Sequence, residues 1–399
     1  MSTPHERFLN LMRFQPVDRM PLWEGEPWPS AVHRWQREGL GEGNQPHLYD
    51  ECENKVQCGV DLWMRPRYPR RTVADDGRYI TRWTEFGVLE RVVASPDEMS
   101  MPQHIEYPVK TRADWDLLRP RFAPGDPGRF PDDWASRCDA WRAAAPVLVL
   151  QDRRAPSLFG FVRELMGPER ALYAFHDEPA LVDDIMETQT QMVLDLLPRV
   201  IAEAPLSAIF FWEDMCYRGG PLISPDMFRR FMLPRYRRIT DRAHSLGVDL
   251  CFVDSDGDVS QLIPLWLEAG IRGVYPMEVA AGMDVVKLRA QFGRDLLMTG
   301  GIDKRVLARD RRAIDAELET KVPLAEQGGY IPHIDHAIPH DVPYGNLLYY
   351  WQRKKQLLGV EPSDAHRDPH GTIGKTPRPV KTDLHGSSQP KATKMQLAE

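Results

Sequence analysis

The feature that most constrains the fold is an alternation of short apolar runs with helix-like segments over residues 146–358. Several of these helix-like segments stop at glycine, as at Gly247, Gly270 and Gly293, which is a common helix end. Strand–helix alternation with short connections indicates a parallel sheet. With two earlier runs we count about eight repeats, so we expect a (β/α)₈ TIM barrel. An open dinucleotide-binding sheet is disfavoured because no glycine-rich fingerprint follows a run. The apolar runs are residues 20–23, 59–64, 146–150, 207–211, 248–253, 273–276, 296–299 and 330–333.

Two parts of the chain depart from this alternation. Residues 72–100 alternate between polar and apolar and are rich in aromatic residues, which predicts an inserted β-hairpin or small sheet. Residues 361–399 are rich in Pro, Ser, Lys, His and Gly, a composition typical of disorder. The predicted fold class is therefore α/β, a TIM barrel over residues 1–360 with an N-terminal β-rich insertion, followed by a disordered tail.

Composition narrows the class of protein. A net charge of −7 without a basic stripe argues against a nucleic-acid partner. No apolar run is long enough for a membrane-spanning helix, and the N-terminal residues lack the apolar core of an export signal. We therefore expect a cytoplasmic protein with no membrane partner. Five scattered cysteines indicate reduced thiols; they are Cys52, Cys58, Cys138, Cys216 and Cys251, and we expect Cys251 to be a buried small apolar residue.

Residues 248–258 begin as an apolar run and end in acids around Gly257. The run predicts a buried parallel strand. Asp254 and Asp256 then project to the same side, because side chains alternate along an extended chain. Two carboxylates held together favour a bound cation or a shared proton.

The C-terminal ends of barrel strands converge on one mouth, where barrel enzymes build their active sites. A cluster with many acids, an imidazole and no organised thiols suits a divalent metal such as Zn, Mn, Fe or Mg. The simpler alternative for any single acid is that it caps the following helix. We expect His333 and His340 to be loop residues. The strand-end candidates are Glu24, Arg153, Glu213, Asp214, Asp254, Asp256, Glu278, Asp303, Asp335 and His336.

Five motifs follow one another along the chain, at residues 159–167, 212–215, 220–225, 300–303 and 328–336. Together they resemble the uroporphyrinogen decarboxylase and corrinoid methyltransferase superfamily. The resemblance spans roughly residues 8–358 and implies a (β/α)₈ barrel, which agrees with the alternation described above. Relatives are usually homodimers, so a homodimer is also implied.

The chain departs from both branches of that superfamily. The decarboxylases carry an arginine-rich motif that grips porphyrinogen carboxylates, whereas residues 23–27 here are acidic and would repel such a substrate. His336 matches a histidine of that branch. The methyltransferases hold zinc with a His-X-Cys pair and a later Cys; Asp254, Asp256 and His336 stand at those positions. Zinc can be held by Asp and His, so zinc is the metal that the resemblance favours, with Mn, Fe or Mg as alternatives.

The leading hypothesis is a metal-dependent group-transfer enzyme that transfers or removes a methyl group of a small substrate. The superfamily's usual acceptor is a corrinoid protein. The main alternative is a metal-free decarboxylase or lyase, in which an acid and His336 handle protons; a non-catalytic binding barrel is a third. The residues assigned are Asp254, Asp256 and His336 for the metal, Glu213, Asp214 and His336 for acid–base steps, and Trp23, Glu24, Arg153, Trp212, Tyr217, Glu278 and Asp303 for substrate binding.

Overall fold

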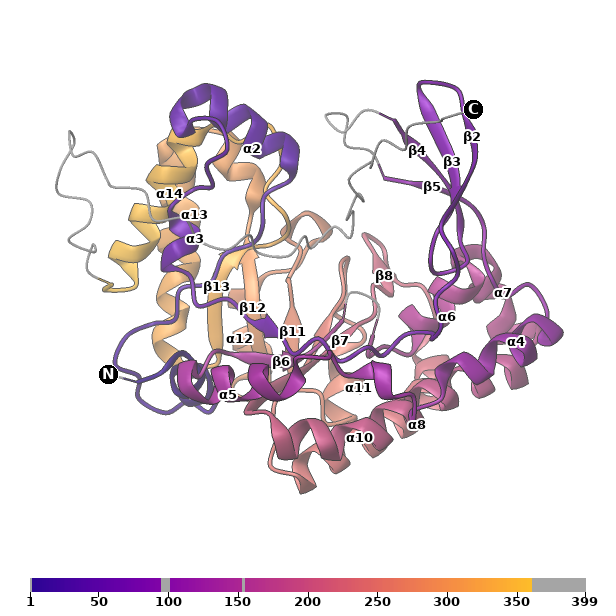
Figure 1. The fold of residues 1–399 in the computed structure, drawn as a ribbon. Helices are drawn as coiled ribbons and strands as arrows, with labels where there is room; N and C mark the ends of the chain where they lie inside the picture. Colours follow the sequence, from indigo (N-terminus) through magenta and orange to yellow (C-terminus); the bar gives the residue numbers. More distant parts are fainter. Residues whose placement is uncertain (1, 95–100, 153–154, 361–399) are drawn as a thin grey trace. The chain divides into compact units, whose positions relative to one another are not determined.

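Seven parallel strands form the central sheet of the computed structural model, which describes residues 2–94, 101–152 and 155–360 (Figure 1). Every neighbouring pair in this sheet is parallel. The sheet is a half-barrel that fits a TIM-barrel-like fold. In order across the sheet, the strands are β1 (Val56–Gln57), β6 (Leu148–Leu150), β7 (Leu206–Trp212), β10 (Cys251–Asp254), β11 (Gly273–Tyr275), β12 (Leu297–Ile302) and β13 (Tyr330–Ile334).

Two predicted strands are absent from the sheet. Residues 20–23 are irregular, although Leu22 O accepts a hydrogen bond from Glu53 N at 2.8 Å. Further along, Ile338 N donates to Glu26 O, and Pro27 forms an isolated parallel bridge with Ile338. Proline has no N–H for a ladder, so this segment lies beside the chain after β13 without forming a regular strand. Residues 59–64 are irregular as well, and the short strand β1 precedes them.

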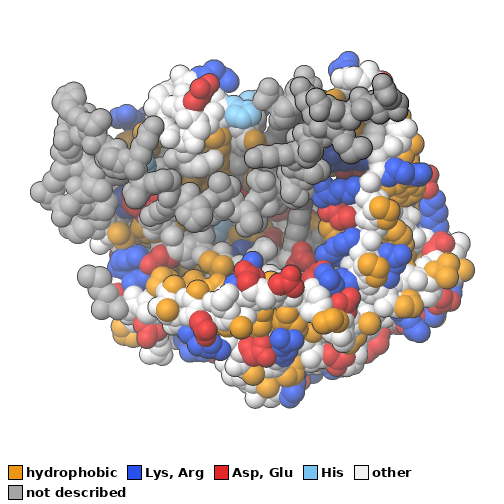
Figure 2. Space-filling model, in the orientation of Figure 1, with side chains coloured by type: hydrophobic (Ala, Val, Ile, Leu, Met, Phe, Trp, Pro, Cys, Tyr) orange, Lys and Arg blue, Asp and Glu red, His pale blue; other side chains and the backbone are white. Residues whose placement is uncertain are grey.

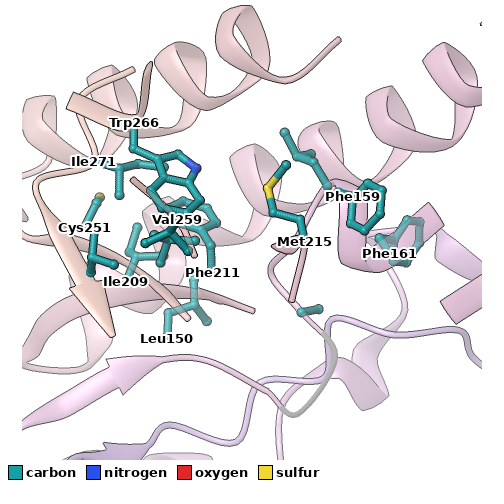
Figure 3. Close-up of a cluster of buried hydrophobic side chains, with 14 of the residues drawn as sticks. Leu150, Phe159, Phe161, Ile209, Phe211, Met215, Cys251, Val259, Trp266 and Ile271 are labelled. Atoms are coloured by element: carbon teal, nitrogen blue, oxygen red, sulfur yellow. The ribbon is translucent and has the colours of Figure 1, made fainter. Parts of the chain in front are cut away.

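The outer face of the sheet is covered by helices. Figure 3 shows Ile209, Phe211 and Cys251 in one buried cluster with Trp266 and Ile271. Ser224 caps the helical segment after β7 as predicted, because its hydroxyl accepts from Met227 N at 3.2 Å. The α-helices are α1 (Pro4–Met12), α2 (Pro29–Trp35), α3 (Leu48–Glu51), α4 (Arg112–Leu118), α5 (Trp134–Ala144), α6 (Phe159–Met166), α7 (Pro168–Asp177), α8 (Pro179–Glu203), α9 (Pro225–Met227), α10 (Leu233–Ser245), α11 (Ile263–Glu268), α12 (Val285–Phe292), α13 (Arg311–Lys321) and α14 (Tyr344–Leu357). Short 3₁₀ or π turns cover Gln36–Leu40, Arg119–Phe122, Pro127–Arg129, Phe228–Met232, Val279–Ala281, Lys304–Ala308 and Val322–Gln327.

A second apolar cluster fills the inner side of the sheet. Its centre is Phe210 of β7, which stacks on Phe252 of β10 with ring centroids 4.7 Å apart. Gly273 makes room for this stack, because a Cβ there would lie 2.0 Å from the Phe252 ring. Helix α1 adds Phe8, which stacks on Trp23 at 5.4 Å. Residues 208, 210 and 212 therefore face inward and residues 209 and 211 outward.

Four antiparallel strands form a separate sheet in the order β2–β3–β4–β5. Figure 1 shows it standing beside α6 and α7. Residues 95–100 of the predicted insertion lie outside the described residues, and the place of this sheet as an insertion stays a prediction. The strands are β2 (Arg71–Asp75), β3 (Tyr79–Trp83), β4 (Leu89–Val93) and β5 (Gln103–Glu106), and a small hairpin pairs β8 (Cys216–Tyr217) with β9 (Gly220–Pro221).

The surface and the remaining sequence predictions fit this architecture. Acidic and basic side chains are intermixed on the face that Figure 2 displays. The five cysteines are free, and Cys251 is buried. No helix in the described part of the chain has the length and apolar character needed to cross a membrane. The predicted tail, residues 361–399, lies outside the described residues.

Candidate functional site

The ends of β7, β10 and β11 bring three side chains to the inner side of the sheet. Asp254 is in register with Trp212 on one side and with Tyr275 on the other. All three side chains lie above the Phe210–Phe252 stack, because alternate residues of a strand share a face. Each is only partly buried. We call this region the barrel mouth. It lies on the inner side of the sheet, at the C-terminal ends of the strands.

Lys55 contributes a cation to the barrel mouth. Its Nζ lies 4.1 Å from the centroid of the Phe210 ring and 4.3 Å from that of Tyr275, within cation–π range. The two rings meet edge to face at 80°, so the ammonium lies in the angle between them. No oxygen of the described residues forms a hydrogen bond or ion pair with Nζ. Burial lowers the pKa of Lys55, although the negative charges of Asp254 and Glu26 oppose the shift.

Asp254 is an acid whose negative charge acts on this lysine. Burial raises the pKa of Asp254, the carboxylates of Asp214 and Asp256 raise it further, and Lys55 opposes them. Gln151 Nε2 lies 3.4 Å from Asp254 Oδ2. Burial thus shifts the two pKa values in opposite directions, down for Lys55 and up for Asp254.

Asp256 and His336 form a second pair at the mouth. His336 Nε2 lies 3.3 Å from Asp256 Oδ2. This contact raises the pKa of His336, and burial opposes the shift. Glu278 fixes the loop that carries Asp256, because its carboxylate accepts a hydrogen bond from Gly257 N at 3.0 Å. The Asp256 carboxylate therefore holds His336 in place and favours its protonated form.

Asp214 lies beside this pair in a strained backbone conformation, with φ of 42°. Arg163 Nη1 donates to Asp214 O at 2.8 Å, and Arg163 Nη2 lies 3.4 Å from Asp214 Oδ2. Burial raises the pKa of Asp214, Arg163 opposes the shift, and the charge of Asp256 adds to it. The same guanidinium lies 4.8 Å from the Trp212 ring. Arg163 thus joins Asp214 and Trp212 at the mouth.

His333 is not the loop residue that we expected. It lies in β13, is 4% exposed, and its ring centroid is 5.7 Å from that of Tyr275. Nδ1 donates to Ile334 O at 2.7 Å, since a carbonyl can only accept, and Nε2 therefore carries the lone pair. Burial lowers the pKa of His333 to about 4, so the ring is neutral at pH 7.

Two residues assigned to substrate binding lie away from the mouth. Glu24 is fully buried, where Lys354 Nζ lies 2.6 Å from Oε2 and Tyr350 OH donates to the same oxygen at 2.7 Å. Its other oxygen accepts from Ile334 N at 3.0 Å. Trp23 is 3% exposed and packs in the inner apolar cluster. Both residues hold the barrel together, because each is enclosed by protein groups.

Glu213 is also enclosed. Its carboxylate accepts from Leu158 N at 2.6 Å and Gly160 N at 2.8 Å, and Tyr236 OH donates to it. Burial raises the pKa of Glu213 to about 7. With no exposed surface, Glu213 anchors the start of α6, and its predicted acid–base role is not favoured by this geometry.

Some of the remaining predicted residues are held by backbone or side-chain partners, and others are exposed or lie outside the described residues. Asp303 caps the turn after β12, and Arg305 binds both of its carboxylate oxygens at 2.8 Å. Asp335 is fully buried and accepts from Lys304 N and Val279 N. Tyr217 is 57% exposed on the β8–β9 hairpin. Arg153 lies outside the described residues. For Asp303 and Asp335, the simpler capping interpretation describes the observed contacts.

The predicted metal ligands do not form a complete site in this arrangement. In residues 2–94, 101–152 and 155–360, no three His, Cys, Asp or Glu side chains are grouped so that they could hold a metal ion. Asp256 contacts His336, whereas Asp254 is directed to the region of Lys55 and Gln151. The donor set therefore does not fit a three-ligand metal as it stands.

Sequence reasoning missed Lys55, Tyr275 and His333 as members of the mouth. Lys55 precedes a strand of only two residues, too short to show an alternating pattern. Tyr275 lies inside a run that was read simply as a buried strand, and His333 ends another run although we expected it in a loop. The period of two could have assigned both to the inner face. Gln151 was visible at a strand end, but an amide alone indicates no chemistry.

Comparisons with known proteins agree with this architecture. The family model described as "Uroporphyrinogen decarboxylase (URO-D)" matches residues 158–356. A uroporphyrinogen decarboxylase of Gloeobacter violaceus is 23% identical over 370 residues, covering 88% of this chain and 97% of that protein. A uroporphyrinogen decarboxylase of a Picosynechococcus species is 22% identical, and the match covers 63% of this chain and 71% of that protein.

A solved methyltransferase from Methanosarcina mazei has the same fold. It matches with a TM-score of 0.55 and 16% identity, covering 89% of this chain and 99% of that one. The curated relatives are named as decarboxylases, which indicates that the chain is an enzyme. Over residues 158–356 the chain matches the uroporphyrinogen decarboxylase (URO-D) family, and its fold is also that of the methyltransferase.

Proposed function

We propose that the chain is a carboxy-lyase that decarboxylates a small organic acid by acid–base chemistry at the barrel mouth. The observation that carries this proposal is the Lys55 ammonium, which lies between two aromatic rings without an oxygen partner among the described residues. A cation in such a place attracts an anionic substrate group, and the apolar walls strengthen the attraction. The curated relatives named as decarboxylases support the reaction class.

Decarboxylation breaks a C–C bond and leaves its electron pair on the remaining carbon as CO₂ departs. That carbon then takes up a proton. Lys55 would stabilise the developing negative charge, and Asp254 would deliver the proton, because burial raises its pKa and keeps it protonated near neutral pH. His336, held by Asp256, is placed to return a proton to the site.

The acids around the mouth favour a small substrate over a tetrapyrrole with many carboxylates. Glu24 no longer contributes to that argument, because Lys354 neutralises it in the interior. The mouth nevertheless carries Asp214, Asp256 and Glu278 in half-buried positions. Several substrate carboxylates would meet these charges, whereas a single carboxylate can reach Lys55.

Metal-dependent methyl transfer is the alternative that the sequence predicts. Its support is weaker here because the three expected ligands do not come together. The metal, the corrinoid acceptor and the homodimer stay predictions. Metal analysis of protein expressed with added Zn, Mn and Fe separates the two functions. We expect substoichiometric metal and unchanged decarboxylation after dialysis against a chelator. One divalent ion per chain, together with chelator-sensitive turnover, would favour methyl transfer.

The direct test is release of labelled CO₂ from a panel of small β-keto, malonic and aromatic acids. We expect turnover of at least one acid by the wild-type chain, and a loss of about 100-fold in Lys55→Met. Lys287→Met is the matched control, because Lys287 is an exposed lysine of α12. Absence of CO₂ release from every acid, or equal release by Lys55→Met, contradicts the proposal.

A further inference from the structure

We propose that Lys55 is a nucleophilic amine that forms an imine with the carbonyl carbon of a keto acid, so that the substrate class is β-keto acids. This inference rests on the proposed carboxy-lyase function and specifies its chemistry. It differs from that function in requiring a covalent bond to Lys55, whereas the function alone needs only the charge.

The first observation is the contrast between Lys55 and the other enclosed lysines. Lys354 donates to Glu24 and to Trp23 O, Lys321 to Glu317 and Gly301 O, and Lys355 to Glu51. Each of these three amines therefore contacts a carboxylate. The described residues give Lys55 Nζ no such partner, and its contacts are the faces of two rings.

An amine in this position is available for reaction. A lysine becomes a nucleophile when desolvation favours its neutral form, and the aromatic walls of Phe210 and Tyr275 desolvate Lys55 in this way. Burial indeed lowers the pKa of Lys55. Asp254 lies at the end of β10, between the strands that carry Phe210 and Tyr275.

The second observation is an open acceptor beside the same acid. Gln151 is 5% exposed, and its Nε2 lies 3.4 Å from Asp254 Oδ2. Its Oε1 is buried and has no hydrogen-bond partner among the described residues. A buried amide oxygen without a hydrogen-bond partner is unfavourable in free energy. We infer that a donor on the bound molecule, such as the hydroxyl of the carbinolamine, forms a hydrogen bond with this oxygen.

The reaction balances because the water released on imine formation is taken up again at hydrolysis, and one proton from solvent is consumed overall. The neutral amine adds to the carbonyl carbon, and the carbinolamine loses its oxygen as water to give a protonated imine. The bond to the carboxylate then breaks, CO₂ leaves, and the electron pair moves through the enamine to the former iminium nitrogen. Protonation of the carbon by Asp254 restores the iminium, and water hydrolyses it to the ketone and free Lys55.

The test is reductive trapping of the full chain with sodium cyanoborohydride and acetoacetate as the probe. Peptide mass mapping should place the reduced adduct on Lys55 in the wild-type chain and in Lys287→Met. Lys55→Arg keeps the charge but cannot form the imine, so trapping should fall at least about tenfold. Adducts distributed over exposed lysines, or trapping unchanged in Lys55→Arg, overturn the inference.

A second measurement does not depend on any variant. Imine formation exchanges the carbonyl oxygen of the probe with solvent, so the wild-type chain should incorporate ¹⁸O from labelled water into acetoacetate faster than buffer does. Exchange at the buffer rate overturns the inference. If CO₂ release persists while trapping and exchange are absent, the carboxy-lyase function stands and the covalent role of Lys55 falls.

Discussion

Lys354 Nζ lies 2.6 Å from Glu24 Oε2, and neither side chain is exposed. The pair joins α14 to the irregular segment that lies beside β13, where the sequence predicted a strand. Lys354 also donates to Trp23 O at 2.8 Å. This ion pair therefore helps to hold the segment in place, as the hydrogen bonds of a regular strand do elsewhere in the sheet.

Replacing Lys354 by Met should destabilise the chain strongly. The substitution leaves the Glu24 carboxylate buried and without its cation, which typically costs about 3–5 kcal/mol. Urea unfolding measures the loss. The double variant with Glu24→Gln should recover part of it, because the uncompensated charge is then gone. A single-variant loss below about 1 kcal/mol would show that the pair is not essential.

Replacing Asp256 by Asn should lower the pKa of His336. The contact with Asp256 raises that pKa, and burial alone would lower it. NMR titration of the ring protons measures the change, with His336→Gln to assign the signal. Because the folded pKa is raised, the pair stabilises the chain at acid pH, and this contribution is lost as pH rises through the folded pKa. An unchanged titration in Asp256→Asn contradicts the assignment.

Glu213 should make stability fall as the pH is raised from 5 to 8. Its pKa of about 7 lies above the ordinary 4.5, so its contribution is complete below pH 4.5 and is lost as pH rises through 7. The difference corresponds to about 3 kcal/mol. Urea unfolding at both pH values should show a smaller pH dependence in Glu213→Gln, and no change in Glu169→Gln, an exposed glutamate of α7. Equal pH dependence in all three chains would refute this prediction.

Gly300→Ala should cost at least about 3 kcal/mol. Gly300 has φ of 98°, and a Cβ there would lie 1.9 Å from Pro276 O. Gly282 is the matched control. Its φ is 101°, but a Cβ added at Gly282 would meet no atom within 4 Å. Its replacement by Ala should cost only about 1–2 kcal/mol. Thermal or urea unfolding of the two variants separates close packing from backbone strain; similar losses would show that packing contributes little.

The sequence was sufficient for the strands that carry the mouth. The predicted runs at residues 207–211, 248–253 and 273–276 overlap strands of one parallel sheet that end at Trp212, Asp254 and Tyr275, because apolar runs and glycine stops are local signals. The run at residues 20–23 looked similar, but its carbonyls accept from Glu53 N and from the side chains of Arg19 and Lys354, in an irregular pattern. Such partners are set by tertiary contacts, which a local run of side chains does not encode.

The prediction of site residues lacked the same tertiary information. Glu24, Glu213 and Asp303 stand near strand ends, as Asp254 and Asp256 do, yet Lys354, Tyr236 and Arg305 occupy their carboxylates. Position along a strand indicates where an acid lies, and only the three-dimensional partners show whether it is free to react. Lys55 was missed for the opposite reason, because its significance comes from rings on two other strands.

The stack of Phe210 on Phe252 forms a floor under Lys55. This floor affects which positions can change when relatives of this chain acquire new substrates. Phe210 and Phe252 stack at 4.7 Å, and Gly273 admits no Cβ beneath them. A substitution that deepened or filled this floor would disturb three adjacent strands at once. We therefore expect substitutions that change substrate specificity to lie in the loops after the strands. One such loop runs from Ser255 to Asp258, where a replacement leaves the floor intact.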